Sequence, residues 1–328
     1  MAKKVSIKDI ATKVGVSTAL VSYVMNGLEK EKRVGKEIVE KIKKAAEELN
    51  YQPNQIARSL RTGSTNTLGL IVADISNSFF GHLARIIEDE ASQLNYAVIV
   101  GSYDENWRKS NALAETLLNR QVDGFILIPS EGDEELVQSF LDKEIPFILI
   151  DRNFANIDCN YVMLDNFRAT YQATSHLIEN GYSRIKLVAY RSSLNHMKDR
   201  VEGYLQAMSA FGLSTSIELI EPKASDHSVP MDEIVGLFDS EAILFATNTL
   251  TIAGLYAIQR KKLKIPEQLA IVGFDRTEVY DFFVPPITYI EQPMAEIGQL
   301  AVQNLVKLIA GSKEAVHLRL SPQFIERQ

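Results

Sequence analysis

Cysteine is almost absent from this chain of 328 residues. Cys159 is the single cysteine, so no internal disulfide can form. The sequence has no CxxC or HExxH spacing, and its five histidines are dispersed. We therefore expect no bound metal and no cofactor.

Long apolar runs are also missing. No stretch approaches the roughly 18 uninterrupted apolar residues of a membrane helix, and the start "MAKKVSIKDI" has no apolar export-signal core. With 46% hydrophobic and 23% charged residues, the composition is that of an ordinary soluble globular protein. We expect a cytoplasmic protein with two or more domains, since 328 residues exceed what one small core organises.

Sequence signatures of catalysis and nucleotide binding are missing as well. No GxGxxG, GxxxxGKS or GxxxxGKT loop occurs. The segment "SRIK", residues 183–186, matches SxxK, but it begins an apolar run and lacks the SDN and KTG partner motifs. We therefore expect no enzyme and assign no catalytic residue.

Charge is distributed unevenly along the chain. Residues 1–65 contain 13 Lys and Arg against 7 Asp and Glu, a balance of +6, whereas the whole chain carries -7 and the other 263 residues therefore -13. A basic head on an acidic body is typical of a polyanion-binding module joined to a sensor. Lysines that only solvate exposed helices are the alternative explanation.

The segment "SIKDIATKVGVSTALVSYVMNG" predicts a helix, a turn and a second helix. Ile7, Ile10 and Val14 recur at helical spacing, Gly15 breaks the run, and Ser17 is placed to cap the next helix. A third helix, residues 36–49, would complete a small core.

The second helix has two distinct faces. Leu20, Val21 and Val24 share its core side, and the opposite side carries Thr18, Ala19, Ser22 and Tyr23. That opposite side is free to enter a DNA major groove, which admits one α-helix and shows a different donor and acceptor pattern for each base pair.

The next segment, "NYQPNQIARSLRTG", predicts a short hinge helix between Pro53 and Gly63. A helix of about eight residues is marginal alone in water, so it would become ordered only against a partner. Leu60 would then form a wedge between base steps in a minor groove, flanked by Arg58 and Arg61. A plain interdomain linker is the alternative.

From Thr67 on, apolar runs alternate with amphipathic helices, which predicts a parallel α/β body. The runs are "TLGLIVA", "YAVIVGS", "VDGFILI", "PFILI", "RIKLVAY", "AILFAT" and "LAIVGF". Ligands bind beyond the carboxyl ends of such strands. The polar residues found there are Asp74, Asn77, Tyr103, Asp104, Ser130, Asp151, Arg152, Tyr190, Arg191, Asn248 and Asp275.

The stretches "IKDIATKVGVSTALVSYVMNG" and "LNYQPNQIARSLRTGSTNTLGLIVADISNSFF" resemble the lactose and galactose repressor (LacI/GalR) family. The resemblance implies a homodimeric transcription regulator, most simply a repressor of carbohydrate-use genes, that binds a pseudo-palindromic operator under allosteric control. It implies base reading by Thr18, Ala19 and Tyr23, and the predicted DNA contacts are Ser17, Thr18, Ala19, Ser22, Tyr23, Asn26, Asn54, Ala57, Arg58, Leu60 and Arg61.

The resemblance also implies an α/β body of two Rossmann-like lobes, as in periplasmic sugar-binding proteins. The predicted boundaries are residues 1–50 for the all-α helix-turn-helix head, 51–65 for the hinge helix and linker, and 66–328 for the effector-binding and dimerisation domain. The N-lobe comprises about 66–162 and 292–320, and the C-lobe about 163–291 and 321–328, with crossovers near Val162, Gln292 and Ser321.

In family terms a small sugar-like effector binds between these lobes. The Arg200 guanidinium would donate hydrogen bonds to two hydroxyls of the effector, and the Asp275 carboxylate would accept a hydrogen bond on the opposite side. Phe79 and Phe80 would stack on the effector ring. A direct ion bridge between Arg200 and Asp275 is the structural alternative. The predicted effector contacts are Asp74, Asn77, Phe79, Phe80, Ser130, Asp151, Arg152, His196, Arg200, Asn248 and Asp275.

Two departures from the family pattern leave the operator and the effector open. Tyr23 replaces an arginine of the recognition helix, and Thr249 in "ATNT" replaces a pocket aspartate. The identity of the effector and the sign of regulation also stay open. The alternative function is a sugar-binding protein of a transport system, which would need an export signal and has no use for a basic head.

Overall fold

The computed structural model describes residues 5–51, 63–222 and 239–327. It divides into two units, Met1–Thr65 and Asn66–Gln328, and each is described by itself. The predicted hinge helix falls almost entirely on residues 52–62, outside the described part.

The first unit contains three helices, α1 (Ile7–Val14), α2 (Thr18–Met25) and α3 (Lys36–Glu48). Gly15, in the left-handed conformation with φ 76°, ends α1, because a residue without Cβ adopts this backbone most easily. The Ser17 hydroxyl accepts a hydrogen bond from the Leu20 N–H at 3.2 Å and so caps α2. Both features agree with the sequence pattern, and α3 ends one residue before the predicted Leu49.

One buried side chain from each helix forms the centre of this head. Ile10, Val21 and Ile42 are fully buried, and Val24 and Ala45 pack beside them. Val21 and Val24 therefore fasten one side of α2 to the core, as the helical wheel predicted. Leu20, assigned to the same side, is only half-buried.

The N-lobe of the body is a six-stranded sheet in the order β11-β5-β4-β3-β1-β2, and all its pairings are parallel. Its strands are β1 (Thr67–Val72), β2 (Ala97–Ser102), β3 (Gly124–Leu127), β4 (Phe147–Ile150), β5 (Tyr161–Leu164) and β11 (His317–Leu320). The helices of this lobe are α5 (Ser78–Gln93), α6 (Trp107–Asn119), α7 (Glu134–Asp142) and α12 (Met294–Ile309).

The C-lobe repeats this architecture, with strand order β12-β10-β9-β8-β6-β7 and one antiparallel pair, β10 with β12. Its strands are β6 (Ile185–Tyr190), β7 (Ser216–Ile220), β8 (Ala242–Phe245), β9 (Ala270–Phe274), β10 (Thr288–Glu291) and β12 (Gln323–Ile325). Its helices in the described residues are α8 (Asn166–Glu179), α9 (Asn195–Ala210), α11 (Asn248–Lys261) and the 3-10 helix η1 (Glu278–Phe282).

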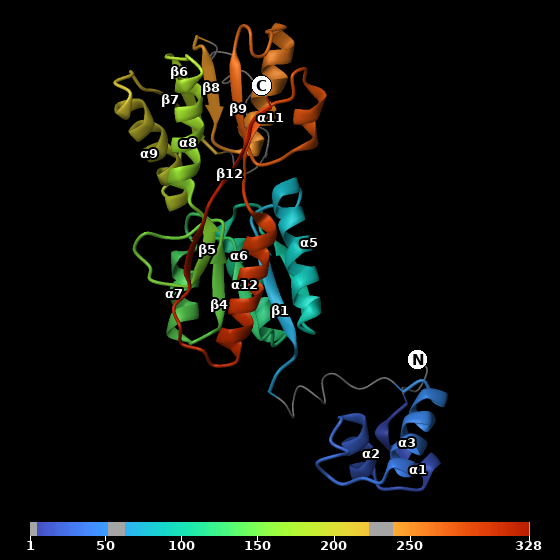
Figure 1. Cartoon of the computed structure of the whole chain (residues 1–328). Helices are drawn as coiled ribbons and strands as arrows, with labels where there is room; N and C mark the ends of the chain where they lie inside the picture. The colour runs from blue at the N-terminus through green and yellow to red at the C-terminus, as the bar shows by residue number, and fades with distance from the viewer. Residues whose placement is uncertain (1–4, 52–62, 223–238, 328) are drawn as a thin grey trace. The chain divides into compact units, whose positions relative to one another are not determined.

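The chain passes between the lobes three times, from β5 to α8, from β10 to α12 and from β11 to β12 (Figure 1). All seven apolar runs of the sequence form strands. The sequence pattern missed β5, β7, β10, β11 and β12, because these strands are short or carry half-exposed polar residues, as in the alternating "HLRL" of β11.

Helices α8 and α9 of the C-lobe pack closely at Gly203. A Cβ at this position would lie 2.2 Å from the Phe167 carbonyl oxygen and 2.4 Å from Thr170 Oγ1. The backbone of α8 cannot yield to such a contact without moving the whole helix, so this glycine sets the distance between the two helices.

We expect Gly203→Ala to destabilise the body by about 1–3 kcal/mol, because the added methyl group overpacks the α8–α9 interface. Urea unfolding of the full chain measures the change. Gly81→Ala in α5 is the matched control, since its Cβ would meet only the Ile75 carbonyl oxygen at an ordinary 3.6 Å. A Gly203→Ala protein as stable as Gly81→Ala would show that the two helices are free to separate.

Candidate functional site

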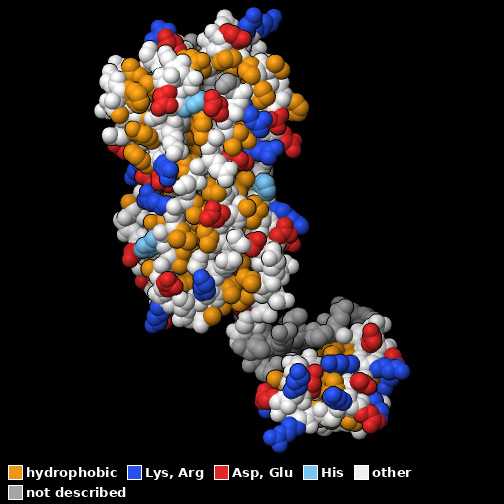
Figure 2. All heavy atoms as spheres, in the orientation of Figure 1, with side chains coloured by type: hydrophobic (Ala, Val, Ile, Leu, Met, Phe, Trp, Pro, Cys, Tyr) orange, Lys and Arg blue, Asp and Glu red, His pale blue; other side chains and the backbone are white. Residues whose placement is uncertain are grey.

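The free side of α2 is formed as the sequence pattern requires. Ser17, Thr18 and Ala19 are exposed, and Ser22 and Tyr23 are half-buried. Lysine and arginine side chains reach the surface of this head (Figure 2). The helix therefore presents a polar, accessible face opposite the buried Val21 and Val24.

Asn26, at the end of this helix, is already hydrogen-bonded within the head. Its amide donates to the Ser22 carbonyl oxygen at 2.6 Å and to Ser22 Oγ at 3.2 Å. These bonds orient both polar side chains on the same side of α2. The other predicted DNA contacts, Asn54, Ala57, Arg58, Leu60 and Arg61, lie outside the described residues.

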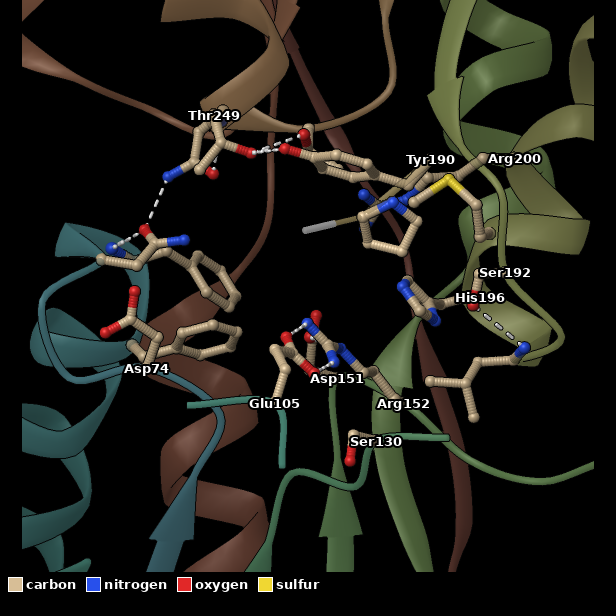
Figure 3. Close-up of a pocket in the computed structure, with 18 of the residues that line it drawn as sticks. Asp74, Glu105, Ser130, Asp151, Arg152, Tyr190, Ser192, His196, Arg200 and Thr249 are labelled. Atoms are coloured by element: carbon tan, nitrogen blue, oxygen red, sulfur yellow. Dashed lines mark hydrogen bonds and ion pairs between the residues drawn. The ribbon is translucent and has the colours of Figure 1, made fainter. Parts of the chain in front are cut away.

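A cavity of about 280 Å³ lies between the two lobes of the body (Figure 3). Every predicted effector contact lines it, namely Asp74, Asn77, Phe79, Phe80, Ser130, Asp151, Arg152, His196, Arg200, Asn248 and Asp275. The carboxyl ends of β1, β3 and β4 of the N-lobe and of β9 of the C-lobe contribute to it, which is where parallel sheets present their ligand groups.

The N-terminus of α5 forms one wall. The Asn77 side chain caps the helix by accepting a hydrogen bond from the Phe79 N–H at 3.0 Å. Phe79 and Phe80, in the first turn of this helix, form the cavity wall. The Phe79 and Phe80 rings lie edge to face with their centroids 5.1 Å apart. This wall supplies the apolar surface on which a ring face could stack.

Arg200 is held by the C-lobe itself. Its Nε donates to Asn166 Oδ1 at 2.8 Å, its Nη1 donates to the Ala246 carbonyl oxygen at 2.6 Å, and its guanidinium lies 3.7 Å from the Phe274 ring centroid. The remaining N–H groups of the guanidinium stay available on the cavity side.

Asp275 follows β9 in the left-handed conformation with φ 59°, and Gln292 Nε2 donates to its Oδ1 at 2.9 Å. Among the described residues, Arg200 and Asp275 make these separate bonds and no ion pair with each other. The ion bridge considered as an alternative is therefore wrong. Each group keeps polar atoms for a ligand.

Burial dominates the electrostatics of the cavity. It raises the pKa of the Asp275 carboxyl to about 7, against an ordinary 3.8, and it also raises the pKa of Asp151. Burial, with the nearby Arg152 and Arg200 charges, holds the pKa of His196 well below its usual range, so its imidazole is neutral at pH 7.

Two of the strand-end residues do not reach the cavity. Tyr103 is fully buried and donates from its hydroxyl to the Ile128 carbonyl oxygen at 2.8 Å. Asp104 forms an ion pair with Lys109 outside the cavity. The residue that does reach it from this loop is Glu105, which was not selected in the sequence because only Tyr103 and Asp104 were taken from the residues after this strand.

Glu105 and Arg152 form a bidentate ion pair inside the cavity. Arg152 Nη1 and Nη2 donate to the two Glu105 carboxylate oxygens, each at 2.8 Å. Arg152 also lies over the Phe80 ring at 5.7 Å. Tyr190, one of the strand-end residues, and Thr249, which replaces a pocket aspartate of the family, also line the cavity, and their side-chain oxygens are 3.2 Å apart.

Side chains of the two lobes bond directly across the cavity. Asn248 Nδ2 of the C-lobe donates to Asn77 Oδ1 of the N-lobe at 2.8 Å. Ser192 Oγ of the C-lobe donates to Glu131 Oε1 of the N-lobe at 3.0 Å. A molecule entering the cavity must therefore meet groups that already fasten the lobes together.

Comparison with known proteins assigns both units. The family described as "Bacterial regulatory proteins, lacI family" matches residues 6–54, and "Periplasmic binding proteins and sugar binding domain of LacI family" matches residues 65–327. This chain belongs to the LacI family. This LacI-family protein is therefore a transcriptional regulator that joins a DNA-binding helix-turn-helix head to an effector-binding body.

Relatives of this LacI-family regulator match it over nearly its whole length. Catabolite control protein A of Priestia megaterium is 31% identical over 318 residues, which are 95% of this chain and 94% of the relative. The HTH-type transcriptional repressor PurR of Aliivibrio salmonicida is 29% identical over 332 residues, 98% of each chain. The lac repressor dimer bound to operator and an anti-inducer is 22% identical and shares the fold, with a TM-score of 0.87 over 99% of this chain and 98% of that one.

Two features are absent from the described residues. None of their helices is long and apolar enough to cross a membrane. In the same part of this LacI-family chain, no three His, Cys, Asp or Glu side chains gather in a way that could hold a metal ion.

The raised pKa of Asp275 predicts a pH-dependent stability. The folded chain binds the Asp275 proton more tightly than the unfolded chain, so the free energy of unfolding falls as pH rises from 3.8 through about 7. The loss is roughly 4 kcal/mol at most. Asp275→Asn removes it and keeps an oxygen for Gln292, so this variant should melt above the wild type at pH 8, and the gap should close towards pH 5.

Thermal unfolding between pH 5 and pH 8 measures this gap. Asp281→Asn, on η1 of the same lobe, is the control, because the Asp281 side chain is 48% exposed and pairs with Arg327 at the surface, 3.6 Å away. Parallel melting curves for wild type and Asp275→Asn across this range would show that Asp275 is not the group that titrates.

Proposed function

We propose that this chain is a homodimeric, cytoplasmic repressor whose affinity for a pseudo-palindromic operator is controlled by a small sugar-like effector bound between the lobes. One observation carries the proposal: the cavity residues Arg200 and Asp275 are hydrogen-bonded to Asn166 and Gln292, which lie at two of the three passages between the lobes. The matched family's description, a sugar binding domain, supports the effector class.

The proposed division of labour follows the predicted boundaries. Residues 1–50 read DNA, residues 51–65 connect the head, and residues 66–328 bind the effector and dimerise. Thr18, Ala19 and Tyr23 are the proposed base-reading side chains, supported by the accessible face of α2. Leu60 is proposed as the wedge in the minor groove, supported by its place in the hinge sequence.

The proposed regulation is a linked equilibrium. An effector that bonds Arg200 and Asp275 competes for groups tied to the first and second passages, so it favours one angle between the lobes over another. If operator DNA also prefers one angle, each ligand changes the affinity of the other by the same factor. An effector without such a preference would bind and change nothing.

The proposed homodimer needs a contact surface, and the C-lobe has exposed apolar side chains that suit one. Tyr256 on α11, and Phe282 and Val284 at and after η1, are 55%, 82% and 93% exposed. Val279 and Tyr280 of η1 pack in the same apolar core as α11, so these side chains belong to neighbouring elements. Apolar patches also reach the surface of both lobes in Figure 2. Such patches mark association sites.

Rival functions find less support. A transport protein would have no use for the helix-turn-helix head, which the LacI family match covers. We also propose that the chain is not an enzyme, because its named relatives are transcriptional repressors and regulators. Turnover of a sugar by the purified protein would contradict this part of the proposal.

Selection of DNA duplexes from a random pool tests operator binding. We expect the full chain to enrich an inverted repeat, because a homodimer presents two copies of α2 related by twofold symmetry. Tyr23→Arg should change the preferred base at one position of each half-site towards guanine, since arginine bonds guanine with both ends of its fork.

Glu40→Arg is the control for this selection, because it adds an arginine to the exposed surface of α3 instead of α2. It should leave the preferred sequence unchanged. Identical sequences from wild type and Tyr23→Arg would show that Tyr23 reads no base. Absence of any enriched duplex would refute operator binding itself.

A thermal-shift screen with D-ribose, D-glucose, D-galactose, maltose and cellobiose tests the effector class, since a ligand of the folded state raises the melting temperature. For the sugar that binds, Arg200→Lys should weaken binding by about tenfold or more, because lysine keeps the positive charge but lacks the planar set of guanidinium N–H donors. Arg260→Lys, exposed on α11, is the control. Wild-type sugar affinity in Arg200→Lys would exclude Arg200 from the site.

A further inference from the structure

The described residues around the cavity carry far more acid than base. The acids are Asp74, Glu105, Glu131, Asp151, Glu221 and Asp275, and the guanidinium groups are Arg152, Arg191 and Arg200. Burial raises the pKa of Asp275 and Asp151 and so reduces their negative charge, but the other four acids still outnumber the three arginines. A negatively charged ligand would therefore enter against a field of its own sign. This excess of acid disfavours a negatively charged ligand in the cavity.

Three of these acidic residues have an unfavourable backbone conformation. Glu105, Asp151 and Asp275 each adopt the left-handed conformation, with φ of 54°, 64° and 59°. Residues with a Cβ rarely adopt it, and glutamate has no short side chain that would ease the strain. Asp151 and Asp275 directly follow the strands that end at Ile150 and Phe274, and Glu105 lies in the loop after the strand that ends at Ser102. All three line the cavity.

Two of the three arginines are already neutralised. Both Nη atoms of Arg152 are bonded to Glu105, and its Nε lies 3.4 Å from Asp151 Oδ2. Arg191 is paired with Glu221 at the cavity rim. A planar guanidinium with a free fork is the usual binder of phosphate. Here the Arg152 fork is occupied by a carboxylate of the protein itself (Figure 3).

Among the described residues, three buried atoms of the cavity lining have no hydrogen-bond partner, and the one charged group among them, Arg152 Nε, lies in an ion pair with Asp151. His196 Nδ1 and Gln292 Oε1 have no hydrogen-bond partner among the described residues, although the two side chains are only 6% and 3% exposed. Buried polar atoms without partners are costly, so they indicate where a ligand supplies the missing bond. The His196 imidazole is neutral because burial lowers its pKa, so it suits a hydroxyl better than a phosphate.

We propose that Glu105 is a specificity-determining residue, which occupies the Arg152 fork so that the cavity accepts an uncharged polyol and rejects a phosphorylated one. The inference rests on the proposed function only in taking this cavity as the effector site. It assigns to Glu105 a role in choosing the ligand. The same carboxylate both repels an anion and removes the guanidinium that would bind it.

Inorganic phosphate is the probe, because it carries the rejected group without requiring the effector to be known. Its binding to the full chain is measured by phosphorus NMR line broadening at pH 7 and constant ionic strength, with sulfate as a second anion. We expect no saturable binding to the wild type. Glu105→Gln should show saturable binding, with an affinity at least about tenfold above the upper limit set by the wild type, because one nearby negative charge is removed and the Arg152 guanidinium is bonded less fully.

Two further variants complete the experiment. The double variant Glu105→Gln, Arg152→Gln should lose the gain in phosphate affinity, since it no longer has the Arg152 guanidinium. Glu88→Gln is the control, because it removes a more exposed carboxylate from an arginine pair on α5, away from the cavity. Glu105 is half-exposed, and Arg152 keeps Asp151 as a neighbour, so the single variant should fold, which its melting curve verifies.

Saturable phosphate binding to the wild-type cavity would overturn the proposal. So would a Glu105→Gln protein without any gain, or a gain that persists in the double variant. These outcomes leave operator selection untouched, so they are distinguishable from a failure of the proposed function. A chain that enriches no duplex yet gains phosphate binding in Glu105→Gln would refute the regulator and keep the role of Glu105.

Discussion

The hydrogen bond from Arg200 Nε to Asn166 Oδ1 joins the cavity of this protein to its backbone between the lobes. Asn166 is the first residue of α8, directly after the chain leaves the N-lobe sheet, and its own amide donates back to the Leu164 carbonyl oxygen at 3.1 Å. A second bond of this kind links Gln292, just after β10, to Asp275. The charged groups of the cavity are thus held by the same residues about which the lobes would turn.

This arrangement explains how a small molecule could change the body of the protein on binding. Binding that rearranges either bond changes the torsions available at a passage, and the bonds from Asn248 to Asn77 and from Ser192 to Glu131 are made or lost together with the angle between the lobes. Interfaces of this type favour discrete arrangements over gradual deformation. The coupling needs no long pathway, since the cavity and the passages share side chains.

Charge separates the two tasks of the chain. The head has an excess of base, which favours the phosphate backbone of DNA, and the body has an excess of acid that extends into its cavity. A ligand cavity with an excess of basic residues, as in the head, would attract nucleic acid in competition with the head. The ion pair of Glu105 with Arg152 has the same effect locally, because it occupies a guanidinium that would otherwise attract phosphate.

The sequence by itself determined the elements that local physics controls. Apart from the edge strand β2, the apolar runs become inner strands of the two sheets, because strands that are buried on both faces are apolar along their whole length. Gly15 and Ser17 define the turn of the head through their own backbone and hydroxyl. Strand-end position was enough to select residues such as Asp74, Ser130 and Asp275 that do meet around one cavity.

Only the tertiary structure decided which neighbours act together. Tyr103, Asp104 and Glu105 are equivalent in a sequence pattern, yet one is buried, one pairs outside and one reaches Arg152, because two successive left-handed residues redirect the chain after β2. Gln292 meets Asp275 only because β9 and β10 are adjacent in the C-lobe sheet. Contacts between residues far apart in the chain depend on strand order and crossover geometry, and neither is encoded in the local periodicity of the residues involved.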